Sequence, residues 1–129
     1  LHGHSDGDVA LHAVADALLG AAGLGDLGRL FPSDARTPRG VASEALLREV
    51  VARLAGVGLR PATVDLVIIG ARPRLAARLD AMRDAIAGVL GISPAAVNVK
   101  ASTGNLAGDE GAGRSISARA VATVRSAGA

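Results

Sequence analysis

The segment TVDLVIIG, residues 63–70, constrains the fold more than any other part of the sequence. Its β-branched content predicts a buried strand. A second strand, AVNVKA, is predicted at residues 96–101, and a helix at about residues 74–90 lies between the two. That helix carries apolar residues at four- and three-residue spacing, namely Leu75, Leu79, Met82 and Ile86. This order of elements favours a sheet with helices packed on it.

Two more helices and a third strand are predicted in the rest of the chain. Residues 8–22 form an apolar helical pattern that ends in a run of glycines. A second pattern, which ends at Gly56, follows Ser43, and we expect Ser43 to be its N-cap. Residues 115–124 alternate between apolar and polar, which predicts a strand with one wet face. The fold class expected for these 129 residues is a single α/β domain with helices packed on one face of a mixed β-sheet.

The composition excludes several classes of protein. Half of the residues are apolar, mostly Ala, Val and Leu, and Phe31 is the only aromatic residue, so the core must be filled by close packing of small side chains. The absence of cysteine excludes disulfides and thiolate metal ligands. The net charge of +2 gives no reason to expect a nucleic-acid partner, and no apolar run reaches the roughly 18 residues of a membrane span. We therefore expect a cytoplasmic protein with no membrane partner.

The start of the chain holds all three histidines, His2, His4 and His12. His12 and Asp16 are four residues apart and share one helix face. Imidazole and carboxylate both bind zinc-type cations, and a carboxylate can also orient a ligating histidine. The alternative is a polar helix edge that faces water. The run HGHSDGD allows a third interpretation, a metallo-hydrolase that binds two metals through His2, His4 and Asp6, although it lacks the last histidine of that pattern.

Two loops that follow predicted strands offer groups that bind phosphate. GARPRL, residues 70–75, combines arginines with backbone amides ahead of a helix. KASTGN, residues 100–105, offers two hydroxyl groups and loop amides. Because both loops follow strands, they can converge on one edge of the sheet. The alternative for each loop is an ordinary turn.

Three motifs together resemble the family of 2-C-methyl-D-erythritol 2,4-cyclodiphosphate synthases of the non-mevalonate isoprenoid pathway. They are HSDGDVALHAVADALLGAAGLGDLGRLFP at residues 4–32, RPR at 72–74 and VNVKAST at 97–103. The resemblance implies an α/β sandwich that assembles as a threefold homotrimer, with active sites between adjacent subunits. It implies a phosphorus–oxygen lyase that converts 4-diphosphocytidyl-2-C-methyl-D-erythritol 2-phosphate to the 2,4-cyclodiphosphate and releases CMP. It also implies a zinc-type ion on the protein and a magnesium or manganese ion on the diphosphate.

The resemblance also implies roles for individual residues, carried over by position. His12 is the expected metal ligand, and His4 and Thr103 are expected to stabilise the transition state. From the four-residue spacing we infer that Asp16 is the partner of His12. Substrate contacts are expected from Ser5, Asp26, Leu27, Gly28, Phe31, Pro32, Ser33, Asp34, Ala35, Gly70, Ala71, Arg72, Pro73, Arg74, Leu75, Ala76, Ser102 and Asn105.

Two departures from the family's pattern leave alternatives open. Nothing matches the Asp-x-His pair that supplies two metal ligands in the family, and we expect about thirty upstream residues that carry this pair. Asn105 stands where the family usually has a glutamate near the diphosphate-bound cation, and an amide oxygen binds magnesium less strongly. Asp109 or Glu110 can replace it after a loop shift, or the chain is a lineage variant with unchanged chemistry. The alternative function is a catalytically weakened trimeric paralogue that binds nucleotide or diphosphate.

Overall fold

The computed structural model describes residues 6–30, 39–70, 76–102 and 116–128 of the chain. The helices are α1 (Asp6–Ala22), α2 (Leu27–Leu30), α3 (Arg39–Gly56) and α4 (Ala76–Leu90), with a short 3-10 helix, η2 (Pro94–Ala96). The strands are β1 (Leu59–Ile69), β2 (Val97–Ser102) and β3 (Ser117–Ser126). Every helix and strand predicted from the sequence is present, and the two short elements α2 and η2 were not predicted.

Strand β1 is the centre of the sheet. The strand order is β2-β1-β3, with β2 parallel to β1 and β3 antiparallel to it, so the sheet is mixed as predicted. Val64 of β1 pairs with Val97 of β2 and with Ala122 of β3. Helix α4 connects β1 to β2, because two parallel strands need a crossover connection.

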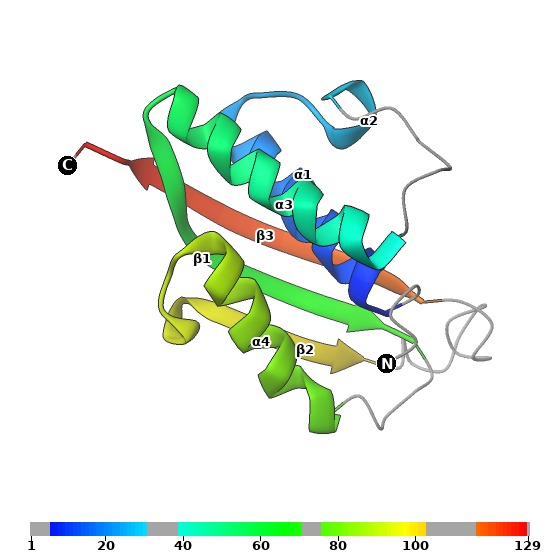
Figure 1. Ribbon diagram of the computed structural model, residues 1–129. Helices are drawn as coiled ribbons and strands as arrows, with labels where there is room; N and C mark the ends of the chain where they lie inside the picture. The colour runs from blue at the N-terminus through cyan, green and yellow to red at the C-terminus, as the bar shows by residue number, and fades with distance from the viewer. Residues whose placement is uncertain (1–5, 31–38, 71–75, 103–115, 129) are drawn as a thin grey trace.

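The three long helices cover one face of this sheet (Figure 1). Helix α1 lies against β3, α4 lies against β2, and α3 packs on α1 and also reaches β1. The core between these layers is aliphatic. Its largest fully buried apolar side chains are Leu18, Leu19, Leu47, Leu54, Leu66, Ile68, Ile86, Val14 and Val50. The predicted packing of helices on one face of the sheet is confirmed.

No described element covers the opposite face of the sheet, which we call the open face. It consists of Thr63, Asp65, Val67 and Ile69 of β1, Asn98, Lys100 and Ser102 of β2, and Ser117, Arg119, Val121 and Thr123 of β3. Asp65 accepts hydrogen bonds from Lys100 Nζ at 3.1 Å and from Asn98 Nδ2 at 3.2 Å. These bonds, that from Lys100 first, hold the pKa of Asp65 below its ordinary value of 3.8. The predicted wet face of β3 lies here, with Arg119, Val121 and Thr123 exposed.

The largest differences from the predicted boundaries are at the starts of α3 and β1. Helix α3 begins at Arg39, so the prediction of Ser43 as its N-cap is wrong. Ser43 is buried inside the helix because it shares a stripe with Leu47, Val50 and Leu54. Strand β1 begins at Leu59 rather than at residue 63, despite Pro61. Pro61 is tolerated because β1 pairs there with β3 alone, at a register shift, and β2 needs no amide from it.

None of the described helices is both long enough and apolar enough to cross a membrane.

Candidate active site

The carboxyl ends of β1 and β2 lie side by side at one edge of the sheet. The amide of Gly70 donates to the carbonyl oxygen of Ser102 at 2.8 Å, and Ile69 is the register partner of Ser102. The strand ends from which the two loops expected to bind phosphate begin are therefore adjacent, whereas the loops themselves lie outside the described residues. The carboxyl edge is also where open α/β sheets bind their ligands.

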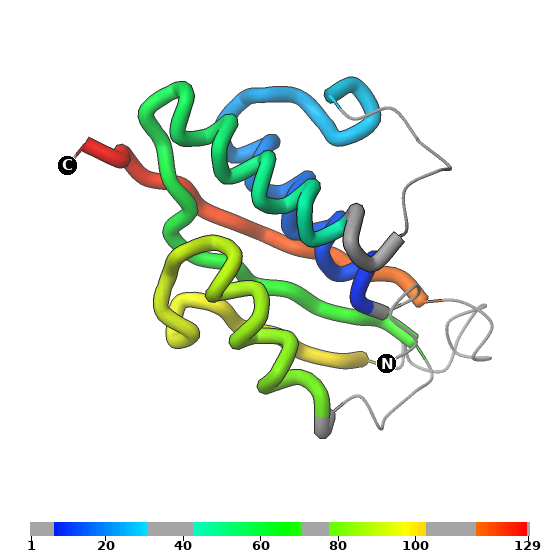
Figure 2. The backbone as a smooth tube through the Cα atoms, viewed as in Figure 1, coloured from blue at the N-terminus to red at the C-terminus, as the bar shows by residue number. Residues whose placement is uncertain are grey.

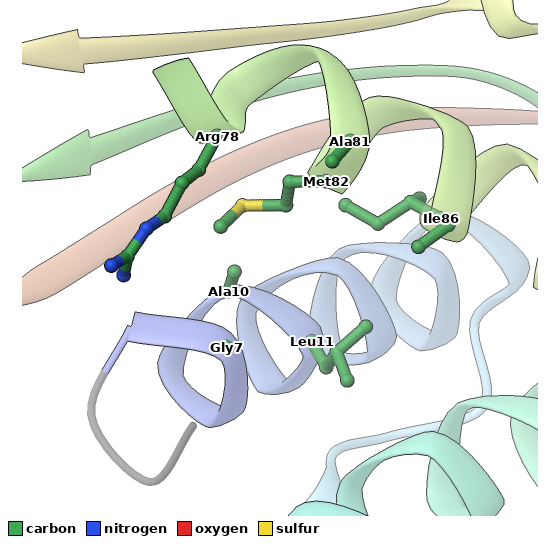
Figure 3. Close-up of a pocket in the computed structure, with 8 residues that line it drawn as sticks. Gly7, Ala10, Leu11, Arg78, Ala81, Met82 and Ile86 are labelled. Carbon is green, nitrogen blue, oxygen red and sulfur yellow. The ribbon is translucent and has the colours of Figure 1, made fainter. Parts of the chain in front are cut away.

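Helices α1 and α4 begin at this same end of the molecule (Figure 2). An apolar groove of about 320 Å³ runs between them. Its lining consists of Gly7, Ala10 and Leu11 of α1 and Arg78, Ala81, Met82, Ala85 and Ile86 of α4. Figure 3 shows the guanidinium group of Arg78 extending toward the first turn of α1. The groove therefore lies between helices α1 and α4. The residues expected to bind phosphate come before the start of each of these helices in the sequence.

His12 lies on the second turn of α1 with an exposed side chain. Its Nε2 atom is 3.4 Å from the hydroxyl oxygen of Ser43 on α3, within hydrogen-bonding distance. Ser43 is 2% exposed, so this contact joins a buried hydroxyl group to a ring at the surface. The expected metal ligand is therefore accessible, and one of its two ring nitrogens is turned to the neighbouring helix.

Asp16 does not orient His12, contrary to our inference from the spacing. Its Oδ1 atom accepts a hydrogen bond from the amide of Leu27 at 3.0 Å. Asp26 accepts one from the amide of Arg29 at 3.0 Å, which makes Asp26 the N-cap of α2. The first amide groups of a helix have no hydrogen-bond acceptor within that helix. The carboxylates of Asp16 and Asp26 each accept a hydrogen bond from one of these amides in α2. Asp16 thus holds α2 beside α1, one helical turn from His12.

This arrangement determines where the expected substrate residues Asp26, Leu27 and Gly28 lie. They form the start of α2, where Asp26 and Gly28 are exposed and Leu27 is half-buried. A Cβ atom added at Gly28 would lie 3.4 Å from the Asp26 carboxylate, which is ordinary van der Waals contact. The expected metal ligand and this expected substrate segment are therefore on one side of the molecule.

A zinc-type ion can be tested against the donor groups that the structure describes. Within the described ranges, no group of three or more His, Asp or Glu side chains could hold a metal ion. His12 fits as one ligand: its ring is accessible, and its second nitrogen has a hydrogen-bonding partner, as is usual for metal-bound imidazoles. A complete site needs further donors.

Many of the predicted site residues lie outside the described part of the chain. The structure says nothing of His2, His4, Ser5, Phe31, Pro32, Ser33, Asp34, Ala35, Ala71, Arg72, Pro73, Arg74, Leu75, Thr103 and Asn105, nor of the side chains of Asp6 and Ala76. Gly70 is buried and Ser102 is exposed, both at the carboxyl edge of the sheet. The metallo-hydrolase interpretation depends on His2, His4 and Asp6, so it remains untested.

Sequence reasoning missed Ser43 as a member of the site. The signal was available, because Ser43, Leu47, Val50 and Leu54 follow the four-three-four spacing of one helix face. A serine in the buried stripe of a helix needs a hydrogen-bonding partner. The rule that serine often caps a helix hid this second possibility.

Comparison with known proteins identifies the family. The family model described as "YgbB family" matches residues 1–125. The chain is 54% identical over 125 residues to the bifunctional enzyme IspD/IspF of Desulforudis audaxviator, covering 97% of this chain and 32% of that protein. It is 54% identical over 119 residues to the 2-C-methyl-D-erythritol 2,4-cyclodiphosphate synthase of Methylococcus capsulatus, covering 92% of this chain and 75% of that one.

The similarity of the fold to a solved structure supports the same family. The structure of IspF of Plasmodium falciparum in complex with CDP superimposes with a TM-score of 0.81 at 28% identity, covering 95% of this chain and 74% of that one. The chain spans about a third of the length of the bifunctional relative and three quarters of the single-function one. It belongs to the YgbB family, the family of 2-C-methyl-D-erythritol 2,4-cyclodiphosphate synthases that its motifs resemble.

Proposed function

We propose that this chain is a cyclodiphosphate synthase. It converts 4-diphosphocytidyl-2-C-methyl-D-erythritol 2-phosphate to 2-C-methyl-D-erythritol 2,4-cyclodiphosphate and releases CMP. The observation that carries this proposal is the pairing of Gly70 with Ser102, which starts both expected phosphate-binding loops at one edge of the sheet. The CDP bound to the Plasmodium falciparum relative supports a cytidine diphosphate-linked substrate.

The reaction needs no nucleophile from the protein. An oxygen of the substrate's 2-phosphate attacks the β-phosphorus, the bond from that phosphorus to the bridging oxygen breaks, and CMP leaves with the electron pair. The protein must fold the substrate so that the two phosphates meet, and it must neutralise the charge of the transition state. His4 and Thr103 take the second task, with Ser5 and Ser102 on phosphate oxygens, and residues 70–76 hold the cytidine end.

Metal ions are part of this proposal. His12 is one ligand of a zinc-type ion, which supplies positive charge to the phosphates when it is bound. A magnesium or manganese ion accompanies the diphosphate. The accessible ring of His12 supports the first assignment. Because no group of three such donors gathers within the described ranges, this proposal takes further ligands from residues outside them.

The working unit in this proposal is a homotrimer in the cytoplasm, with active sites between subunits. The open face supports it, because Val121 is 71% exposed there and Val67 and Ile69 are only half-buried. An exposed apolar side chain on an uncovered sheet face, beside the half-buried Val67 and Ile69, favours contact with another protein surface.

The test is incubation of the chain with the cytidylylated substrate, zinc and magnesium. We expect CMP by chromatography and a cyclic diphosphate by phosphorus NMR, both abolished by a chelator. A folded chain that releases no CMP contradicts the proposal. If that chain still binds CDP, the result favours the paralogue that binds nucleotide without turnover.

A further inference from the structure

We propose that Ser43 is a positioning residue that fixes the imidazole ring of His12. It turns Nε2 toward α3 and leaves Nδ1 as the atom that binds the metal ion. This inference rests on the proposed function for the metal, and it adds a residue and a ring nitrogen that neither the motifs nor the comparisons assign.

The burial of Ser43 is the first argument. Its side chain lies in the apolar stripe of α3 with Leu47, Val50 and Leu54, and Ser43 itself is 2% exposed. A buried hydroxyl group is unfavourable unless it is hydrogen-bonded. The structure gives the Ser43 side chain a partner in the ring of His12. An apolar residue would suit this stripe without the cost of burying a hydroxyl group, so we assign the hydroxyl group of Ser43 a polar task.

The geometry of the ring is the second argument. Nε2 of His12 is 3.4 Å from Ser43 Oγ, and each residue sits inside a long helix that packs on the other. Two packed helices hold this contact more firmly than a loop would. Because Nε2 is occupied by this contact and His12 is an exposed residue, Nδ1 is the ring nitrogen left for a metal ion.

The chemistry of imidazole completes the argument. A metal ion binds a ring nitrogen through its lone pair, and in a neutral ring the other nitrogen carries the proton. With Nε2–H donating to Ser43 Oγ, the lone pair stays on Nδ1. A donor–acceptor contact of this kind fixes both the orientation and the tautomer of a ligating histidine. Asp16, the rival for this role, is already bound to the Leu27 amide.

The test uses the full chain, labelled with ¹⁵N and loaded with ¹¹³Cd²⁺ as the probe. We expect the cadmium–nitrogen coupling of His12 to appear on Nδ1. Zinc affinity is measured in parallel by competition with a chromophoric chelator. Ser43→Ala should weaken zinc binding by about 10- to 100-fold, whereas Ser43→Thr, which keeps the hydroxyl group, should stay within about threefold of the wild type.

Asp16→Asn is the matched control, because it changes the residue that sequence spacing favours as the partner of His12. It should leave zinc affinity within about threefold of the wild type. Coupling to Nε2, an unchanged affinity in Ser43→Ala, or a large loss in Asp16→Asn overturns the proposal. If Ser43→Ala fails to fold, the coupling in the wild type and the affinity of Ser43→Thr decide.

The outcome is separable from the proposed function. A chain that releases no CMP but shows cadmium on Nδ1 and a loss in Ser43→Ala keeps the role of Ser43. A chain that takes up no cadmium still has a ring tautomer, which long-range ¹H–¹⁵N spectra of the metal-free protein report. The proton must then be on Nε2 in the wild type and spread over both nitrogens in Ser43→Ala. A proton on Nδ1 in the wild type overturns the proposal.

Discussion

The two faces of the sheet differ in what holds them together. On the covered face, Val64, Leu66 and Ile68 are at most 3% exposed beneath three helices. On the open face, Thr63 and Asp65 of the same strand make polar contacts with neighbouring strands, such as that of Asp65 with Lys100. Val67 and Ile69, further along the strand, are apolar and only half-buried. Successive residues of β1 therefore point in turn to the buried core and to the open face, with a period of two residues. The comparison teaches that the covered face provides stability and that the open face is available for another surface.

The largest expected effect is on the covered face. Leu66 lies on the central strand and is fully buried, so Leu66→Ala removes apolar contacts and leaves a cavity. We expect a loss of about 2–5 kcal/mol in the free energy of unfolding, measured by urea denaturation. Val121→Ala on the open face, measured in a dilute monomeric sample, should stay within about 0.5 kcal/mol of the wild type. An equal loss at both positions contradicts the comparison.

Association of subunits is the second effect. If the open face is the surface between copies, Val121→Asp places a carboxylate inside that contact. We expect light scattering coupled to size exclusion to show smaller particles than for the wild type, with an unchanged circular dichroism spectrum. Val57→Asp is the control, because Val57 is also exposed, at 54%, but lies at the turn after α3. A variant at Val121 that assembles like the wild type removes the open face as the interface.

The covered face is also the part that the sequence predicted best. Aliphatic residues at strand and helix periods determine which elements form and which side they bury, as the stripe of α3 and the alternation of β3 illustrate. Helix α2 was missed because its four residues are too short for a period. Ser43 and Asp16 were misassigned for another reason. Spacing shows which face a polar side chain occupies, but not which of several nearby donors it binds.

For the candidate site, too, the sequence predicted where residues lie better than which partners they bind. Parallel strands place their carboxyl ends side by side, and the bond between Gly70 and Ser102 shows this for β1 and β2. The convergence of the two loops that follow stays a prediction, because they lie outside the described residues. The spacing of the α3 stripe could show that Ser43 is buried and needs a hydrogen-bonding partner. It could not show that this partner is His12, which is remote in the chain. The roles of His4 and Thr103 stay predictions, since both residues lie outside the described ranges.

A smaller effect is expected from the threonine pair of the open face. The hydroxyl oxygens of Thr63 and Thr123 are 2.6 Å apart across the β1–β3 pair. Replacing either residue by valine keeps the shape and removes the hydrogen bond. A double-mutant cycle should give a coupling of about 0.2–1 kcal/mol. A coupling as large as the loss at Leu66 would mean that the open face also provides much of the stability.

The smallest expected effect on the free energy of unfolding comes from Asp65, and it has a specific dependence on pH. Its pKa in the folded protein is lowered, chiefly by the hydrogen bond from Lys100 and then by that from Asn98. A lowered folded pKa means that the unfolded chain binds the proton more readily. The stabilisation is therefore present above the ordinary value of 3.8 and is lost as the pH falls through the lower folded pKa.

The side chains of Asp65 and Lys100 are about half exposed, so solvent screens the pair. Asp65→Asn should flatten the acid side of the stability profile slightly and leave its slope near neutral pH unchanged, as urea titrations at a series of pH values would measure. A profile that is flattened near neutral pH instead would mean that a different group interacts with Lys100 on this face.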